Sequence, residues 1–83
     1  MRVNHKQASQ VMALKQFLSR DAGDSGILHE SDGENIPFEV TGRETIPWPG
    51  SQTMIRLVCQ NVLTGSVFNL DSVKINVEKV DWD

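Results

Sequence analysis

The tetrapeptide at positions 23–26, Gly-Asp-Ser-Gly, is the arrangement that surrounds the nucleophilic serine in one class of hydrolases. That chemistry also needs a histidine base and an acid that orients it, held within hydrogen-bond reach of the serine. His5 and His29 are the two histidines, and 83 residues are too few for the double barrel that positions such a triad. A turn that ends a helix explains the tetrapeptide better. We predict that the protein has no catalytic residues and is not an enzyme.

Four side chains that can bind a metal ion lie close together in the next segment, namely His29, Glu30, Asp32 and Glu34. A calcium loop needs acidic oxygens at fixed alternating positions and a bidentate glutamate at its twelfth residue, and this segment lacks that pattern. A structural zinc site needs four ligands, whereas the chain has one cysteine and two distant histidines. A solvated acidic turn is the better interpretation. We predict no metal site and no cofactor, since a glycine-rich phosphate loop is also absent.

Cys59 is the only cysteine, so no disulfide can form within the chain. It falls on the predicted inward face of a strand, where a free thiol behaves as a small apolar side chain. A reactive thiol would need an exposed, electropositive site. Polar residues interrupt positions 8–18, so the N-terminal segment lacks the continuous apolar stretch of a signal peptide or membrane span. These features favour a cytoplasmic protein without a membrane partner.

Apolar residues near the N-terminus recur every three or four positions, at Ala8, Val11, Leu14 and Leu18, with Phe17 beside them. This spacing predicts an amphipathic helix within residues 1–20. A linker at 21–25 follows, because its aspartates and its glycine favour turns. We expect the apolar stripe to face the core of the protein. The alternative is that the stripe faces a groove on a partner.

Charge is divided unequally along the chain. Residues 1–20 carry four basic side chains and no acid, a charge of +4, whereas residues 21–83 carry eleven acids and four basic side chains, a charge of −7. We expect the basic helix to dock on the acidic remainder of its own chain. The alternative is a basic arm that contacts phosphate or an acidic partner. The acidic body is itself a poor platform for nucleic acid.

After residue 26 the apolar period changes to that of a strand, and the alternation predicts strands at 27–30, 36–41, 53–61, 66–70 and 73–77. Asp32-Gly33 and positions 63–65 are typical of hairpin turns. Pro37 confines its strand to a sheet edge or a strand start, and a bulge or strand end is expected near Lys79. Because proline has no backbone donor, Pro47 and Pro49 predict a loop at 46–50. The sequence therefore predicts one α+β domain over residues 1–83, with a small five-stranded, mostly antiparallel β-barrel over residues 26–83.

The order of features over residues 25–70 resembles the N-terminal barrel domain of bacterial elongation factor P. The features that carry the resemblance are Gly26-Ile27-Leu28, Asp32-Gly33-Glu34, Pro49-Gly50 with Gln52, Ile55-Arg56, and Asn61-Val62-Leu63-Thr64-Gly65. The resemblance implies an SH3-like barrel and a role in translation. In that family a lysine at the tip of the Pro-Gly loop reaches the peptidyl-transferase centre, whereas Ser51 stands in that neighbourhood here.

Trp48, which stands between two prolines, is the first candidate for a binding residue. Aromatic side chains displayed on rigid loops are typical of surfaces that bind partners. The alternative is that Trp48 folds back to cap the barrel, while Trp82 is expected to pack down and tether the last strand. The predicted partner-binding residues lie around the Trp48 loop and on the basic helix: Trp48, Arg43, Ser51, Gln52, Lys6, Lys15 and Arg20.

These observations together predict a small non-enzymatic adaptor module that acts through protein–protein contacts. The alternative is an RNA- or ribosome-associated factor, in which the helix contacts phosphate and a base stacks on Trp48. A core of this size supplies only about 3–5 kcal/mol. Formation of a homodimer is therefore a further alternative.

Overall fold

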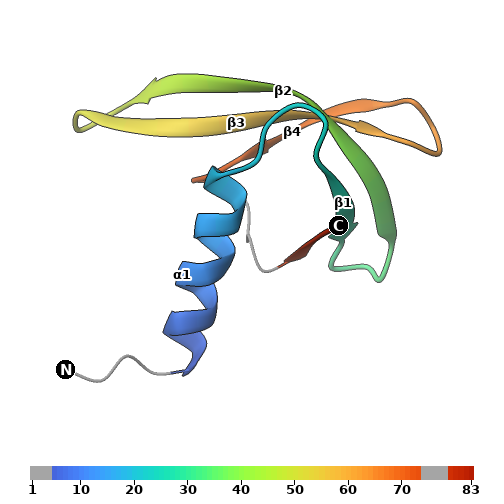
Figure 1. Cartoon of the computed structure of the whole chain (residues 1–83), viewed down its shortest axis with the longest axis horizontal. Helices are drawn as coiled ribbons and strands as arrows, with labels where there is room; N and C mark the ends of the chain where they lie inside the picture. The colour runs from blue at the N-terminus through green and yellow to red at the C-terminus, as the bar shows by residue number, and fades with distance from the viewer. Residues whose placement is uncertain (1–4, 74–78) are drawn as a thin grey trace.

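The chain folds into one helix and one five-stranded antiparallel sheet (Figure 1). The structure is a computed structural model that describes residues 5–73 and 79–83, and only the backbone of residues 5–10. Its elements are α1 (His5–Leu18), β1 (Ser25–His29), β2 (Asn35–Trp48), β3 (Gln52–Asn61), β4 (Val67–Asp71) and β5 (Val80–Trp82). The strand order is β4-β3-β2-β1-β5, so the sheet is open, with β4 and β5 as its edges. The predicted α+β class with five antiparallel strands is confirmed.

The hairpin turns form where the sequence predicts them. In the β1–β2 hairpin Gly33 has φ 91°, and the Glu30 N–H donates to the Glu34 carbonyl at 2.8 Å. In the β3–β4 hairpin Gly65 has φ 80°, and its N–H donates to the Asn61 carbonyl at 2.8 Å. Glycine is favoured at both positions because side chains destabilise a positive φ. The final strand predicted over 73–77 lies mostly outside the described residues, and β5 begins at Val80.

The Gly-Asp-Ser-Gly tetrapeptide joins the first and last strands. β1 pairs with β5, so that Gly26 faces Trp82 across the ladder. A Cβ atom at Gly26 would lie 2.5 Å from the Asp81 carbonyl oxygen, a distance that only glycine accommodates. The Ser25 hydroxyl donates to Oδ2 of Asp83 at 2.6 Å. Ser25 and Gly26 of the tetrapeptide therefore hold β5 beside β1.

The predicted loop at residues 46–50 is wrong for 46–48, which belong to β2, whereas a turn does form from residue 49 to residue 51. β2 continues to Trp48 and pairs with β3 through Ile46↔Met54, Pro47↔Thr53 and Trp48↔Gln52. β1 pairs with β2 only as far as Glu39, and a register shift between Val40 and Gly42 marks a bulge just beyond that point. The outer side of β2 has no strand beside it there among the described residues, so a residue without a backbone donor is tolerated.

Four aromatic rings cross the inner face of the sheet, which we call the aromatic row: Phe17, Trp82, Phe38 and Phe68. Phe17 and Trp82 lie edge to face with ring centroids 6.4 Å apart, and Trp82 and Phe38 lie 5.4 Å apart. Phe38 meets Phe68 at 5.9 Å, again edge to face. Phe17 and Phe38 are completely buried. The row connects α1 to the core, and Trp82 tethers the last strand as predicted.

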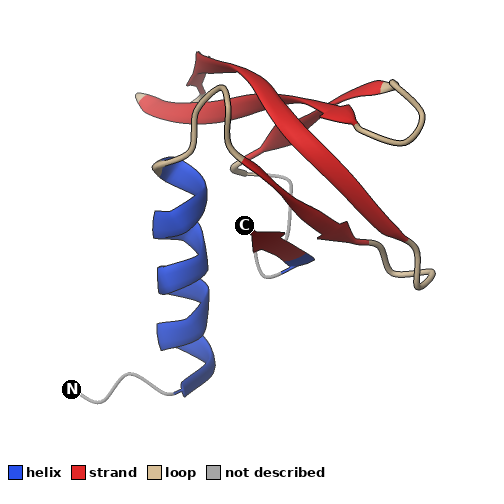
Figure 2. Ribbon diagram, turned by 45° about the vertical axis from the view of Figure 1, so that its right-hand side comes forward, coloured by secondary structure: helices blue, strands red, loops and turns tan. Residues whose placement is uncertain are grey.

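The expected burial of the helix stripe is wrong for most of its residues. Phe17 is buried, but the exposed fractions are 51% for Val11, 63% for Met12, and 38% for both Leu14 and Leu18. The helix meets the rest of the protein at its last turn and extends away from the sheet (Figure 2). Within the described part of the chain, Val11 and Met12 therefore have no core to face.

Arg43 fixes this angle between the helix and the sheet. Its Nη1 atom donates to the Leu18 carbonyl at 2.7 Å and to the Arg20 carbonyl at 2.6 Å. Carbonyls at the end of a helix have no partner within the helix, and a cation beside them also complements the helix dipole. Arg20 adds a second contact, because its guanidinium lies 4.8 Å from the centre of the Trp82 ring.

Replacing Arg43 with methionine should lower the free energy of unfolding by about 1–2 kcal/mol, since the charged donor to both carbonyls is lost while the apolar stem is kept. Urea unfolding followed by circular dichroism measures the change. Gln16→Met is the matched control, because Gln16 is exposed in the last turn of the same helix and receives the same side chain. Equal stabilities of the two variants would contradict the capping role of Arg43.

Candidate functional site

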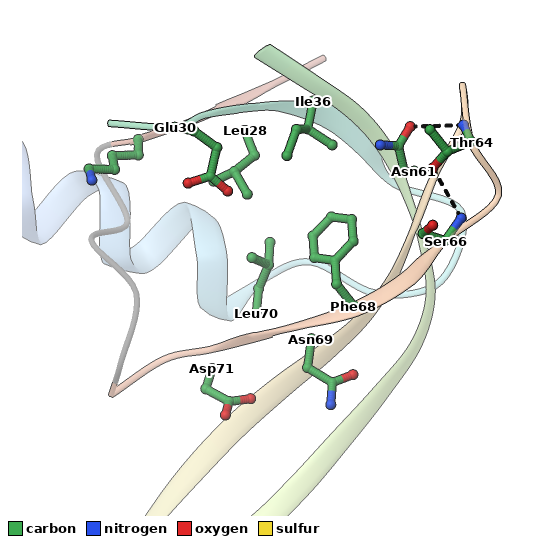
Figure 3. A pocket seen from close by; sticks show the side chains of 11 residues that line it. Leu28, Glu30, Ile36, Asn61, Thr64, Ser66, Phe68, Asn69, Leu70 and Asp71 are labelled. Carbon is green, nitrogen blue, oxygen red and sulfur yellow. Dashed lines mark hydrogen bonds between the residues drawn. The ribbon is translucent and has the colours of Figure 1, made fainter. Parts of the chain in front are cut away.

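A pocket of about 610 Å³ opens between β4 and the β1–β2 hairpin (Figure 3). Its lining comes from β1, the first residues of β2, the β3–β4 hairpin, β4 and the residue before β5. The lining residues are Leu28, Glu30, Ile36, Asn61, Thr64, Ser66, Phe68, Asn69, Leu70, Asp71 and Lys79. The volume lies within the range of about 300–1,000 Å³ that is usual for ligand pockets.

The floor of the pocket is apolar. Phe68 and Leu70 are two residues apart in β4, so their side chains point to the same face of the sheet. Leu28 of β1 is paired with Ile36 of β2 across the ladder, and these two side chains face Phe68 and Leu70 over the gap (Figure 3). Leu28 and Leu70 are buried, whereas Ile36 and Phe68 are half-buried and pack against the core. The pocket is thus an uncovered extension of the core.

The β3–β4 hairpin forms a polar wall at one end of the pocket. The Asn61 side-chain oxygen accepts from the N–H groups of Leu63 and Thr64 at 2.9 and 3.3 Å, and the Thr64 hydroxyl accepts from the Ser66 N–H at 3.2 Å. These bonds hold the hairpin rigid. Beside the wall, Leu63 is 77% exposed and Val67 is 67% exposed. Neither residue lines the pocket, so the hairpin exposes a separate apolar surface on its outer side.

Acidic side chains border the opposite side of the pocket. Glu30, Asp32 and Glu34 are all exposed on the β1–β2 hairpin, which carries no basic residue. Asp71 accepts two hydrogen bonds from Arg56, at 2.8 and 3.1 Å, and this pairing raises the pKa of Arg56. The Asp71 charge is thereby balanced. Glu30 is the hairpin acid that lines the pocket, and Lys79 brings a basic side chain to the same lining.

The predicted binding residues fall into two separate groups. Trp48, Ser51 and Gln52 lie at the far end of the β2–β3 hairpin, where Trp48 is half-buried and the other two are exposed. Ser51 has φ 61°, the strained conformation of a tight turn. The structure does not bring this hairpin tip next to the basic helix, and none of its residues lines the pocket.

The second group belongs to the helix and its junction with the sheet. Arg43 and Arg20 make their contacts there within the chain. Lys15 is exposed in the last turn of α1, and Lys6 lies in its first turn. Among these predicted cations, Lys15 is the one that the structure describes with an exposed side chain and no contact.

The sequence analysis missed the pocket residues. Two signals in the sequence point to them: the alternation that sets Phe68 and Leu70 on one face of a short strand, and the acids of the neighbouring hairpin. Neither signal says that β4 is an edge strand, and that position is what leaves the gap. Spacing alone predicts which side chains of β4 lie on the inner face of the sheet. It does not predict that part of this face is left uncovered.

Cys59, the one candidate for a reactive thiol, has a structural position. Cys59 is completely buried, and desolvation raises the pKa of its thiol to about 12, so the nucleophilic thiolate is disfavoured. Within residues 5–73 and 79–83, no group of three or more His, Cys, Asp or Glu side chains is placed to hold a metal ion. No described helix is long and apolar enough to cross a membrane.

Comparisons of the chain with models of protein families, with curated proteins and with solved structures found no match. The resemblance to the elongation factor P barrel therefore stays a prediction.

His29 links the three neighbouring strands β1, β2 and β5. Its Nδ1 lies 2.7 Å from Oδ1 of Asn35 in β2, and its Nε2 lies 2.6 Å from Oδ2 of Asp81 in β5. Both partners are acceptors, and an imidazole donates from both nitrogens only when it is protonated. The hydrogen bond to Asn35 and then that to Asp81 raise the pKa of His29 above 6.5.

Because the pKa of His29 is higher in the folded than in the unfolded protein, the stability from this link is present below pH 6.5 and is lost as the pH rises through the folded value. The urea midpoint of the wild-type chain should therefore fall between about pH 6 and pH 8. In His29→Gln the fall should be smaller. The same pH dependence in both proteins would show that the link does not contribute.

Proposed function

We propose that the protein is a small cytoplasmic, non-enzymatic adaptor module that binds a segment of a protein partner in the pocket between β4 and the β1–β2 hairpin. The segment places an apolar side chain on the floor of Leu28, Ile36, Phe68 and Leu70, and basic side chains beside the hairpin acids. The observation that carries the proposal is this apolar floor, left open and bordered by Glu30 of a hairpin that exposes two further acids.

The position of β4 at the edge of the sheet supports binding of an extended segment. Among the described residues, β4 pairs with β3 alone, through Arg56↔Asp71 to Gln60↔Val67. The other side of an edge strand offers backbone donors and acceptors to an added strand. Peptides bound in this way gain affinity from main-chain hydrogen bonds and specificity from pockets that take alternate side chains. Here the pocket lies directly beside the edge.

We also propose that the sheet is an SH3-like barrel whose open side is this pocket. The pairing of β5 with β1 supports this view. In the order β4-β3-β2-β1-β5 the edge strands are β4 and β5, and only these two would have to pair to close a barrel. A barrel with a gap on one side takes a partner where a closed barrel would have its own ladder. The same proposal accommodates the resemblance to the elongation factor P barrel.

Fewer observations favour the RNA-associated alternative. Binding of phosphate depends on available lysine and arginine side chains. Arg20, one of the helix cations predicted to contact phosphate, stacks on Trp82, and Arg43 donates to backbone carbonyls, so both are engaged within the chain. The acids that border the pocket would repel a phosphate backbone. We therefore favour a protein partner.

Selection of peptides from a random displayed library, with the whole chain as bait, tests the proposed function. The enriched peptides should carry a large apolar residue with lysine or arginine nearby. Ser66→Trp, which fills the mouth of the pocket from an exposed position, should weaken binding of an enriched peptide at least about tenfold. Glu30→Lys should weaken peptides with basic residues more than their neutral analogues.

Gln52→Trp is the matched control, because it adds the same side chain at an exposed position on the β2–β3 hairpin. It should leave the affinity unchanged. If Gln52→Trp abolishes binding and Ser66→Trp does not, the binding surface is the hairpin with Trp48, and the pocket assignment is wrong. Thermal melts of both variants establish that each is folded.

A further inference from the structure

The exposed face of α1 is the largest feature that the proposed function leaves unexplained. Val11, Met12, Leu14 and Leu18 are between 38% and 63% exposed, although they belong to the apolar stripe of the helix. Figures 1 and 2 both show α1 extending away from the sheet from its last turn. Contiguous apolar surface of this kind is typical of an interaction site.

The length of α1 adds to the argument. The helix has 14 residues, and isolated helices of about 12–15 residues are marginally stable in water. Most of the stability of such a helix comes from packing of its apolar face. Among the described residues, the buried Phe17 and the Arg43 cap stabilise the last turn, and a second surface over Val11, Met12 and Leu14 would stabilise the turn before it.

The charge of the N-terminal segment indicates which kind of surface would cover α1. Residues 1–20 carry four cations and no anion. Of these, α1 itself carries Lys6 and Lys15 and no anion, so pairing of α1 with the α1 of another chain would bring like charges together, which costs free energy. An acidic surface with an apolar centre is complementary instead. The pocket has such an apolar floor, and Glu30 lines it from the β1–β2 hairpin, which also exposes Asp32 and Glu34; Lys79 is the basic side chain in the lining.

The helix does not occupy the pocket of its own chain. No α1 residue lines that pocket. Arg43 holds the carbonyls of Leu18 and Arg20, and Phe17 is locked in the aromatic row, so the direction of the helix is fixed. The helix and the pocket of one chain are thus complementary but cannot meet, whereas those of two chains can.

Resting on the proposed function of the pocket, though not on the addition of a strand to β4, we propose that the partner is a second copy of this chain, which binds through its helix α1. The Leu14 and Leu18 side chains of one copy enter the pocket of the other, and Lys15 faces the acidic β1–β2 hairpin. The second helix makes the same contact in return, which closes a twofold dimer. Two reciprocal contacts also double the buried area, as a small interface needs.

Sedimentation equilibrium of the whole chain, over about 1–300 µM, tests the dimer. Leu14→Asp should abolish dimerisation, whereas Gln16→Asp should not, because Gln16 lies on the opposite side of α1 and receives the same charge. Lys15→Glu and Glu30→Lys should each weaken the dimer at least about tenfold. The double variant with both changes should restore most of the affinity, because it exchanges the two charges.

A wild-type chain that is monomeric over the whole range would overturn the dimer. So would dimerisation that depends on Leu14 but not on Glu30, since that result indicates contact between helices. The peptide selection repeated with Leu14→Asp as bait separates this outcome from failure of the proposed function, because no α1 can then fill the pocket. Peptides that bind this variant through the pocket, together with a monomeric wild type, would leave the proposed function standing and refute only the second copy as partner.

Discussion

The contact of Trp82 with Phe38 and Phe17 is the interaction on which the rest of the structure depends. β5 is only three residues long, and a strand of that length has few ladder hydrogen bonds to hold it. Trp82 adds two edge-to-face ring contacts from this short strand, one to the centre of the sheet and one to the helix. Such pairs stabilise a protein beyond the burial of their area. Gly26 makes the contact possible, because it lets β5 lie against β1.

This dependence explains why the inner face of the sheet is well covered at one end and open at the other. Phe17, Trp82 and Phe38 fill the end near α1, where Val80 is also buried. Phe68 continues the aromatic row to β4, but no helix or strand among the described residues lies over it there. A single helix that contacts the sheet through one turn cannot cover five strands. The pocket is the physical consequence of a core that is too small for its sheet.

The sequence predicts the helix and the strands better than it predicts which parts of the chain pack over them. The change of period after residue 26 correctly places α1 and the first four strands, and Gly33 and Gly65 mark their turns, because these features depend on neighbouring residues. Pro47 misleads for a related reason. Its missing backbone donor would disrupt a sheet only if a second strand lay on the outer side of β2 at that point. β1 ends before it, and the sequence does not show this. In β3 the alternation correctly places Leu57 and Cys59 inside. It does not predict that Met54, on the other face, is also buried.

The predicted site shows the same limit for charged residues. Arg43 and Lys15 are both exposed cations that the sequence analysis placed in a binding surface, yet Arg43 donates to two carbonyls of its own chain, whereas Lys15 does not. The difference arises because the end of α1 meets β2 beside Arg43, a contact between residues 25 positions apart. Residue type therefore indicates that a cation is available for an interaction, but the tertiary contacts decide which cations are left for a partner. By that criterion the exposed apolar stripe of the helix and the hairpin acids are stronger candidates for partner binding. The two arginines are weaker candidates, because they already make contacts within the chain.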